Sequence, residues 1–293
     1  MRVTGFSFIK NAVQFDFPIK EAILSILPLC DEVIVAVGDC TDGTRELVQA
    51  IHPTKIKIID TVWNTALNRD GIVLADETNK ALQAAFATNS HWLIYIQGDE
   101  VLHEDGFAAI TQAMERYKDD QRVDGLLLNY RHFYGSYDYI ATSSHWYKNE
   151  IRIIKNNPNI FSYKDAQGFR KNSNEKLQVK AVDAFVHHYG WVKEPKLMNN
   201  KIVNTGSIWG GDAYTEEHIQ KSLNNTFDYS EIDALAKFKG SHPKIFEKRL
   251  QCINWNFDFD LTYNNVSFKD KLKNLLEKLT GKRPFDYKNY KII

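Results

Sequence analysis

Charged side chains follow several apolar segments of the chain at the points where those segments end. The clearest case is WLIYIQGDEVL, residues 92–102, in which a run typical of a buried strand leads into Asp99 and Glu100. Lys10 and Asp39 stand in the same place after two earlier apolar runs. A simple turn is one interpretation, because Gly-Asp is common turn chemistry. The other is a site for a positively charged ligand such as Mg²⁺ or Mn²⁺, which prefers oxygen ligands.

The first part of the chain alternates between strand-like and helix-like patterns. Nearly unbroken apolar runs, typical of strands covered on both faces, are separated by segments with apolar residues at helical spacing. This alternation predicts parallel strands joined by crossover helices, and ligands of such open sheets bind at the carboxyl ends of the strands. The expected strands are 2–9, 31–39, 55–63 and 91–97, and the expected helices are 18–29, 41–52, 71–88 and 104–117.

The pattern changes in the second half of the chain. Strand-like segments at 123–140, 150–165 and 179–192 are joined by Gly, Asn and Pro turns, and the sequence after Pro195 becomes helical and polar. We therefore expect an α/β fold: a mostly parallel open sheet with flanking helices, a smaller second sheet and a helical C-terminal extension. The expected domains are 1–205 and 206–293.

The composition favours a packed globular protein. Of the 293 residues 43% are hydrophobic, and 37 basic side chains balance 37 acidic ones. A protein that grips nucleic acid usually has a basic excess, so nucleic acid is not expected as a partner. The three cysteines are far apart in the sequence, and no two of them form a C-x-x-C pair. The sequence shows no signal-peptide pattern and no apolar run long enough to span a membrane. These features predict a cytoplasmic protein with reduced thiols.

Two stretches together resemble the family 2 glycosyltransferases, which have the GT-A fold. The first is DEVIVAVGDCTDGTRELV, with an Asp-Gly-Thr turn at residues 42–44, and the second is NKALQAAFATNSHWLIYIQGDEVL. The later HHYGWVKEPKLMNNK is similar to a His-Tyr-Gly-Trp segment of a bacterial surface-polysaccharide branch. The resemblance covers about residues 3–201. It implies an inverting transfer of a sugar from a nucleotide-diphosphate donor to a hydroxyl of a glycan or lipid-linked acceptor, assisted by Mn²⁺ or Mg²⁺.

The resemblance also assigns roles to individual residues. The metal-binding Asp-x-Asp signature of the family reads Gln97-Gly98-Asp99 here, which leaves Asp99 as the expected ligand and Glu100 as a neighbouring or substitute one. Gln97 is a poor metal ligand and is expected to hydrogen-bond the donor. Asn79 in the third helix matches an Asn of the family and is an expected donor contact. Lys10 is expected to contact the donor because of its place at the end of the first strand.

Asp39 and His188 each allow two interpretations. Val37 occupies the position at which the family usually has a base-binding Asp, so Asp39 either takes over that role or caps the following helix. His187 and His188 lie on one expected strand and face opposite sides of it. The resemblance makes His188 a metal ligand, whereas a lone strand histidine is commonly structural.

An inverting transfer needs a carboxylate that accepts the proton of the attacking hydroxyl. Asp165, between a strand-like segment and a Gly turn, is the candidate, with Arg170 nearby to bind phosphate or sugar. Asp138 and Glu150 are the other candidates for this base. The alternative interpretation of Asp165 is an ordinary residue of a surface turn.

Two further features concern the acceptor. Aromatic residues crowd the region 130–147, which predicts either an acceptor groove or ordinary packing on a sheet. The segment 269–291 holds eight Lys or Arg against three Asp or Glu beside a Phe/Leu stripe. It is either a peripheral membrane contact or a terminal helix docked on its own domain.

Two other functions stay open. A sugar-phosphate nucleotidyltransferase has a similar α/β layout, but no Gly-rich phosphate loop follows the first strand. A non-catalytic module that binds sugar nucleotides or glycans would agree with the change of the first signature Asp to Gln97.

Overall fold

The computed structural model describes residues 1–210, 225–263, 266–267, 271–273, 275–276, 279 and 287–293. Within this part of the chain, one large mixed sheet of eleven strands and a separate three-stranded sheet are present. No helix of the described part is long and apolar enough to cross a membrane.

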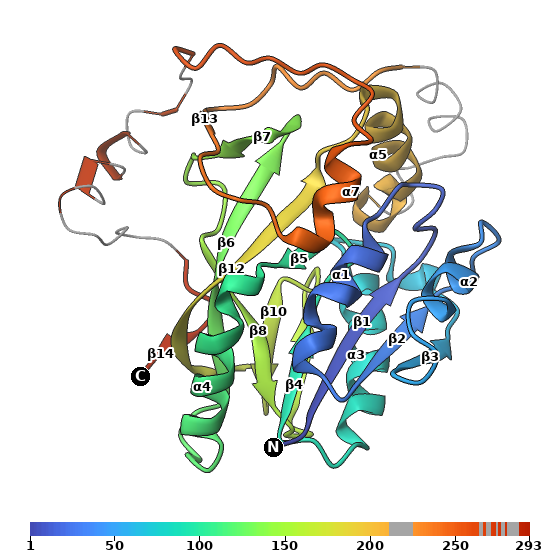
Figure 1. Ribbon diagram of the computed structural model, residues 1–293, viewed down its shortest axis with the longest axis vertical. Coiled ribbons are helices and arrows are strands. Elements are labelled where there is room, and N and C mark those ends of the chain that lie inside the picture. The colour runs from blue at the N-terminus through green and yellow to red at the C-terminus, as the bar shows by residue number, and fades with distance from the viewer. Residues whose placement is uncertain (211–224, 264–265, 268–270, 274, 277–278, 280–286) are drawn as a thin grey trace.

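The N-terminal half of the large sheet is parallel. Strands β1 (Val3–Ile9), β2 (Glu32–Val37), β3 (Ile56–Asp60) and β4 (Trp92–Tyr95) lie in the order β3-β2-β1-β4 and all point the same way (Figure 1). The connections between them contain α1 (Ile19–Ile26), α2 (Thr44–Gln49) and α3 (Ile72–Phe86). The predicted alternation of strand and crossover helix is confirmed.

Strand β2 shows why this part of the sequence is so apolar. Val33 and Val35 pack in one core cluster with the apolar face of α1, and Ile34 packs in another cluster with Ala81 and Leu82 of α3. Both faces of the strand are therefore covered, which agrees with an uninterrupted apolar run in place of alternation.

The other half of the large sheet is mixed. Strand β8 pairs antiparallel with β4 and with β6, and β12 runs parallel to β6 along most of its length. The short β5 pairs antiparallel with β12. The bounds are β5 Glu100–Leu102, α4 Phe107–Tyr117, β6 Gly125–Tyr134, β7 Ser136–Ala141, β8 Asn149–Lys155 and β12 Gln178–Trp191. The predicted smaller sheet is present as β9 (Ile160–Tyr163), β10 (Gly168–Lys171) and β11 (Glu175–Lys176).

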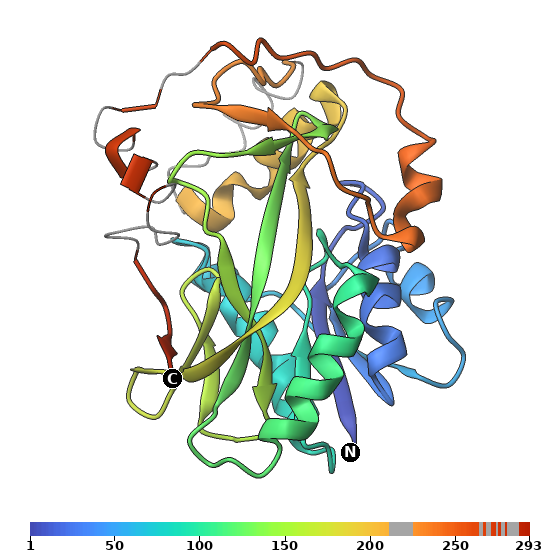
Figure 2. The ribbon, with the colours of Figure 1, turned by 60° about the vertical axis from the view of Figure 1, so that its left-hand side comes forward.

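The C-terminal segment is attached to the large sheet at two places. Strand β13 (Leu235–Lys237) pairs with β7, and β14 (Lys291–Ile292) pairs with the start of β12 (Figure 2). The C-terminal part of the chain also contains α5 (Pro195–Gly210) and α7 (Glu247–Leu250). Short 3-10 helices along the whole described chain occupy Leu27–Leu29, Thr65–Leu67, Glu104–Gly106 and Lys244–Phe246. The predicted boundary at 205/206 falls inside α5, and the division into two domains stays a prediction. Most of the predicted basic helix of 269–291 lies outside the described residues.

Candidate active site

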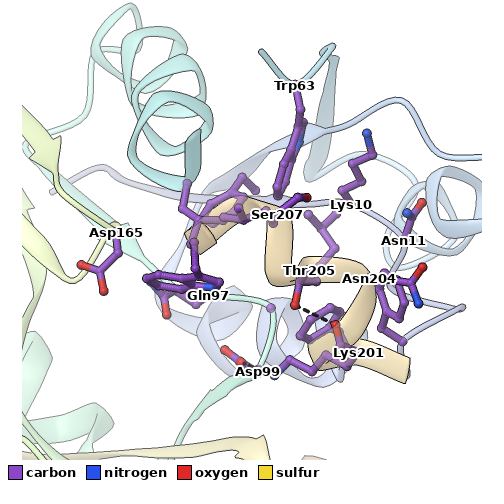
Figure 3. Close-up of a pocket in the computed structure, with 18 of the residues that line it drawn as sticks. Lys10, Asn11, Trp63, Gln97, Asp99, Asp165, Lys201, Asn204, Thr205 and Ser207 are labelled. Atoms are coloured by element: carbon purple, nitrogen blue, oxygen red, sulfur yellow. Dashed lines mark hydrogen bonds and ion pairs between the residues drawn. The ribbon is translucent and has the colours of Figure 1, made fainter. Parts of the chain in front are cut away.

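A cavity of about 650 Å³ lies at the carboxyl ends of β1 and β4. Its wall contains five of the residues singled out in the sequence, namely Lys10, Gln97, Asp99, Asp165 and His188. Figure 3 shows α5 beside this cavity, to which it contributes Lys201, Asn204, Thr205 and Ser207. The strand ends thus converge as the parallel sheet predicted.

The pairing of β5 with β12 brings Asp99 to His188. Glu100 is the register partner of His188, and the backbone N–H of Tyr189 donates to the carbonyl oxygen of Asp99 at 2.8 Å. The Oδ2 atom of Asp99 then lies 3.6 Å from Nε2 of His188 and 3.8 Å from Nζ of Lys201. Burial opposes ionisation of Asp99, but the charge and hydrogen bond of a protonated His188, followed by the charge of Lys201, hold the pKa of this carboxyl well below its usual range. Asp99 is therefore an ionised carboxylate.

The tautomer of His188 follows from its neighbour His132. Nε2 of His132 lies 2.8 Å from the carbonyl oxygen of Tyr147, so it must donate, and burial lowers the pKa of His132 to about 3. Nδ1 of the neutral His132 is therefore an acceptor, and Nδ1 of His188, 3.1 Å away, donates to it. When the His188 ring carries no extra proton, its Nε2 atom is an acceptor that faces the Asp99 carboxylate 3.6 Å away. Two acceptors then face each other, and only a proton or a metal cation between them satisfies both.

Gly190 keeps the space between these two acceptors open. A Cβ atom at this position would lie 2.5 Å from Oδ2 of Asp99 and 2.7 Å from Nε2 of His188. The donor set also fits a divalent cation, since a metal-bound histidine commonly donates its other ring N–H to a fixed partner. The described residues contain no cluster of three His, Cys, Asp or Glu that could hold a metal. Asp99 and His188 would thus be a partial ligand set, which is common for Mg²⁺ at phosphate sites because the substrate supplies further oxygens.

Asp165 lies in the same cavity but on another side of it. Its side chain is half-buried, and its Oδ1 atom is buried without a hydrogen-bond partner in the described structure. Burial raises the pKa of this carboxyl. A carboxylate with a raised pKa and an unpaired oxygen has the properties of a general base. The rivals Asp138 and Glu150 do not line the cavity, and burial raises the pKa of Glu150 to about 8.

Glu100 was predicted as a metal ligand, but its geometry favours a structural role. Its side chain is fully buried and accepts two hydrogen bonds from Arg152, at 2.9 and 2.7 Å, and one from Tyr130 at 2.9 Å. The backbone N–H of Gln97 donates to the same carboxylate at 3.1 Å. With these donors in place Glu100 faces the core, and it does not line the cavity. Asp99 lies in the turn before β5 and Glu100 is the first residue of that strand, and of the two only Asp99 lines the cavity.

Asn79 and Arg170 are also placed away from the cavity. The amide of Asn79 donates to the carbonyl oxygen of Ser162 at 3.0 Å and accepts from its N–H at 2.8 Å, which fastens α3 to β9. The buried guanidinium of Arg170 donates to Tyr163 and to Asn289 in the C-terminal segment. Their expected donor contacts are not supported, because their polar groups are engaged in tertiary structure.

Asp39 lies near the cavity, beside a residue of its wall. Its carboxylate accepts a hydrogen bond from Lys10 at 2.7 Å, and this bond lowers the pKa of Asp39. The alternative of a helix cap is wrong for Asp39, since α2 begins after Gly43 and it is Asp42 that accepts from the N–H of Thr44. A contact of Asp39 with the donor stays a prediction.

His187 belongs to a different, buried network. Arg131 donates to its Nε2 at 3.2 Å, and its Nδ1 lies 3.1 Å from the hydroxyl of Tyr189, which contacts Nδ1 of His242 at 2.7 Å. Burial lowers the pKa of His187 to about 2 and that of His242 to about 4. Both imidazoles are therefore neutral parts of the core.

The contribution of α5 was missed in the sequence. Lys201, Asn204, Thr205 and Ile208 all line the cavity, and their spacing of three, four and seven residues places them on one helix face. That spacing is readable in the sequence, but nothing in it indicates which sheet edge the helix approaches. The amide N–H of Gly71 donates to the carbonyl oxygen of Ile208 at 3.0 Å, which ties the end of α5 to the start of α3.

The predicted aromatic groove is divided between two environments. Most of its members are buried in the cores of the large sheet, namely Tyr130, Phe133, Tyr134, Tyr137 and Tyr139. Trp146 and Tyr147 instead line a second hollow of about 390 Å³ together with Trp191. This hollow shares Tyr147, His188 and Trp191 with the main cavity, so the two are adjacent.

No family model matches the chain, and no curated protein matches it. Among solved structures it is similar to TarS of S. aureus, with 12% identity over 76% of this chain and 42% of that chain, at a TM-score of 0.41. It is also similar to the mannosyltransferase PcManGT from Pyrobaculum calidifontis, solved with GDP-Man and Mn²⁺ (21% identity, 43% of this chain, 34% of that chain, TM-score 0.32).

A third similar structure is glucosyl-3-phosphoglycerate synthase from Mycobacterium tuberculosis in complex with Mn²⁺, UDP and phosphoglyceric acid (16% identity, 45% of this chain, 43% of that chain, TM-score 0.30). The chain thus spans less than half of the length of each of these three proteins. Each of these likenesses has a TM-score below 0.5, so none of them assigns a fold family or an activity to this chain. The chemistry of the site rests on the geometry of this chain.

Proposed function

We propose that the chain is a glycosyltransferase that moves a sugar from a nucleoside-diphosphate donor to an acceptor hydroxyl, with inversion and with the help of Mn²⁺ or Mg²⁺. The observation that carries the proposal is the open space at Gly190 between the Asp99 carboxylate and the Nε2 atom of His188. A divalent cation held there would stabilise the negative charge that develops on the leaving diphosphate.

The chain's own residues supply the remaining parts of such a transfer. The ammonium groups of Lys10 and Lys201 line the cavity and favour a diphosphate. As the bond from the sugar to the diphosphate oxygen breaks, the acceptor oxygen bonds to the same carbon, and Asp165 takes the proton of that hydroxyl. Asp165 needs to be ionised for this step, so its raised pKa places the loss of activity at higher pH than for an ordinary carboxyl.

A thermal-shift screen of UDP, GDP, CMP and their sugars, with and without Mn²⁺, tests the donor site. One nucleotide should stabilise the wild-type protein only with Mn²⁺, and Asp99→Asn should abolish the effect. Asp119→Asn, at a turn outside the cavity, is the matched control. Metal-dependent hydrolysis of the donor sugar distinguishes an enzyme from a non-catalytic binding module, and release of pyrophosphate from a nucleoside triphosphate would indicate a nucleotidyltransferase. Binding of no nucleotide under any condition would contradict the proposal.

For the acceptor, we propose that a saccharide, free or lipid-linked, occupies the second hollow. Aromatic faces suit the apolar faces of sugar rings, and Trp146, Tyr147 and Trp191 supply three of them next to His188. Glu231 and Asp233 in the same hollow offer acceptors for sugar hydroxyls. Trp146→Ala should slow transfer to the acceptor and leave donor hydrolysis unchanged; equal loss of both would contradict this placement.

A peripheral membrane contact of a cytoplasmic enzyme would bring it to a lipid-linked acceptor, as the basic segment 269–291 suggests. Only part of this segment is described, and its end is fastened to the protein through Asn289 and Arg170. A variant with the lysines of 269–282 changed to glutamine should sediment less with phosphatidylglycerol vesicles than the wild type. Equal sedimentation would remove the membrane contact.

A further inference from the structure

Gln97 stands where the resembled family has a metal-binding aspartate, and its side chain has a different use here. Its Nε2 atom lies 3.1 Å from the carbonyl oxygen of Ala166 and 3.2 Å from the hydroxyl of Tyr95. A carbonyl oxygen can only accept, so the amide nitrogen and not the amide oxygen must face Ala166. The orientation of the amide is thereby fixed.

A chain of hydrogen bonds also fixes the direction of the contact with Tyr95. The hydroxyl of Thr78 donates to the carbonyl oxygen of Leu74 at 2.8 Å. Because its hydrogen is used there, Thr78 can only accept from the hydroxyl of Tyr95, 3.1 Å away. The Tyr95 oxygen therefore accepts from Gln97, and both amide hydrogens of Gln97 are needed. An ionised carboxylate at position 97 would place an acceptor against two acceptors.

The loop held by Gln97 carries Asp165. Lys164 and Ala166, on either side of Asp165, have φ angles of 54° and 61°, a left-handed conformation that residues other than glycine adopt rarely. Such backbone persists only where surrounding contacts hold it. Ala166 is itself fully buried, and its carbonyl oxygen is the group that accepts from Gln97.

We infer that Gln97 is a positioning residue, which holds the Lys164–Ala166 backbone so that the carboxylate of Asp165 is directed into the cavity. The inference rests on the proposed function, since it gives Asp165 its task. Gln97 thus has a two-hydrogen donor where the resembled family has a carboxylate, and it links the segment that follows β4, beside Asp99, to the loop that carries Asp165. The leaving-group side and the proton-accepting side of the cavity are joined by one side chain.

Gln97→Met and Gln97→Glu test this inference, because both nearly preserve volume and neither supplies two hydrogens to its neighbours. Gln112→Glu, on the exposed face of α4, is the matched control. We expect faster amide hydrogen exchange in peptides that cover 163–167 for both variants. We also expect turnover to fall about tenfold to a hundredfold, with an unchanged donor dissociation constant and an altered acid limb of the profile of kcat/KM against pH.

Unchanged exchange and unchanged turnover in Gln97→Met would overturn the inference. So would a gain of Mn²⁺ affinity and turnover in Gln97→Glu, because Gln97 would then be an impaired metal ligand. The exchange measurement needs no substrate, and so failure of the anchoring contact is distinguishable from failure of the proposed function. Faster exchange in a protein that binds no nucleotide would support the anchoring contact while contradicting the proposed function.

Discussion

Gly190→Ala is the substitution that tests the metal site most directly. The added methyl group would lie 2.5 Å from Oδ2 of Asp99 and 2.7 Å from Nε2 of His188, in the space proposed for the cation. Gly190 lies in β12 and does not have a left-handed φ angle, so alanine is compatible with its backbone. We therefore expect loss of metal binding in a protein that still folds.

Thermodynamic linkage gives the size of the effect. A ligand at about 100 times its dissociation constant stabilises the native state by about 2.7 kcal/mol. With an unfolding entropy of about 2.1 cal/mol/K per residue, this corresponds to a rise in Tm of about 4 °C for a chain of 293 residues. The crowded methyl group lowers stability by about 1–3 kcal/mol. The assay is therefore the increase in Tm on adding Mn²⁺ with the bound nucleotide, measured for each variant against its own baseline.

Gly106→Ala is the matched control. A Cβ atom there would lie 2.5 Å from Cβ of Ala184, so the methyl group is equally crowded but outside the cavity. This variant should lose stability and keep the full increase in Tm. If Gly190→Ala also keeps the full increase, the cation does not lie between Asp99 and His188, and the reasoning from the acceptor pair is wrong.

Three other measurements address the base, the buried ion pair and the neutral histidines. Asp165→Asn should lower turnover by about 10²–10⁴-fold with an unchanged donor dissociation constant; near-normal turnover in a steady-state assay would exclude it as the base. Arg152→Met removes the buried ion-pair partner of Glu100 and should reduce the free energy of unfolding in urea by about 3–5 kcal/mol. Arg122→Met breaks an exposed ion pair and should leave the free energy of unfolding nearly unchanged. Equal effects would contradict the role of burial. Burial lowers the pKa of His187 to about 2 and of His242 to about 4 from 6.5, so the unfolded chain binds more protons as pH falls through 6.5. Stability should be full above pH 6.5 and fall steadily toward pH 4, and urea titrations that show a constant free energy over this range would refute the neutral network.

Local sequence pattern is sufficient to predict the parallel part of the fold. Unbroken apolar runs such as 33–37, alternating with amphipathic helices, are compatible with few arrangements other than a sheet covered on both faces, and β1 to β4 have that arrangement. The same pattern predicts that Lys10 and Asp99 lie at one edge of the sheet, and both line the cavity there. Pattern suffices for these features because helix and strand periodicity are properties of short segments.

Contacts between segments far apart in the sequence determine which polar residues lie in the site. Asp99 and Glu100 are adjacent and chemically alike, yet one faces the cavity and the other is bound by Arg152, a residue 52 positions away. Asn79 is an expected donor contact by resemblance and Arg170 by its position near Asp165, but their partners lie 83 and 119 positions away along the chain.

The same is true of the residues that the sequence did not reveal. The space at Gly190 between Asp99 and His188 exists because β5 pairs with β12. Lys201 lines the cavity because a backbone hydrogen bond joins the end of α5 to the start of α3. Hydrogen bonds and ion pairs between distant segments depend on directions and distances that a linear pattern does not encode. The sequence therefore predicts the sheet and its ligand-binding edge, whereas the side chains that stand at that edge depend on tertiary contacts.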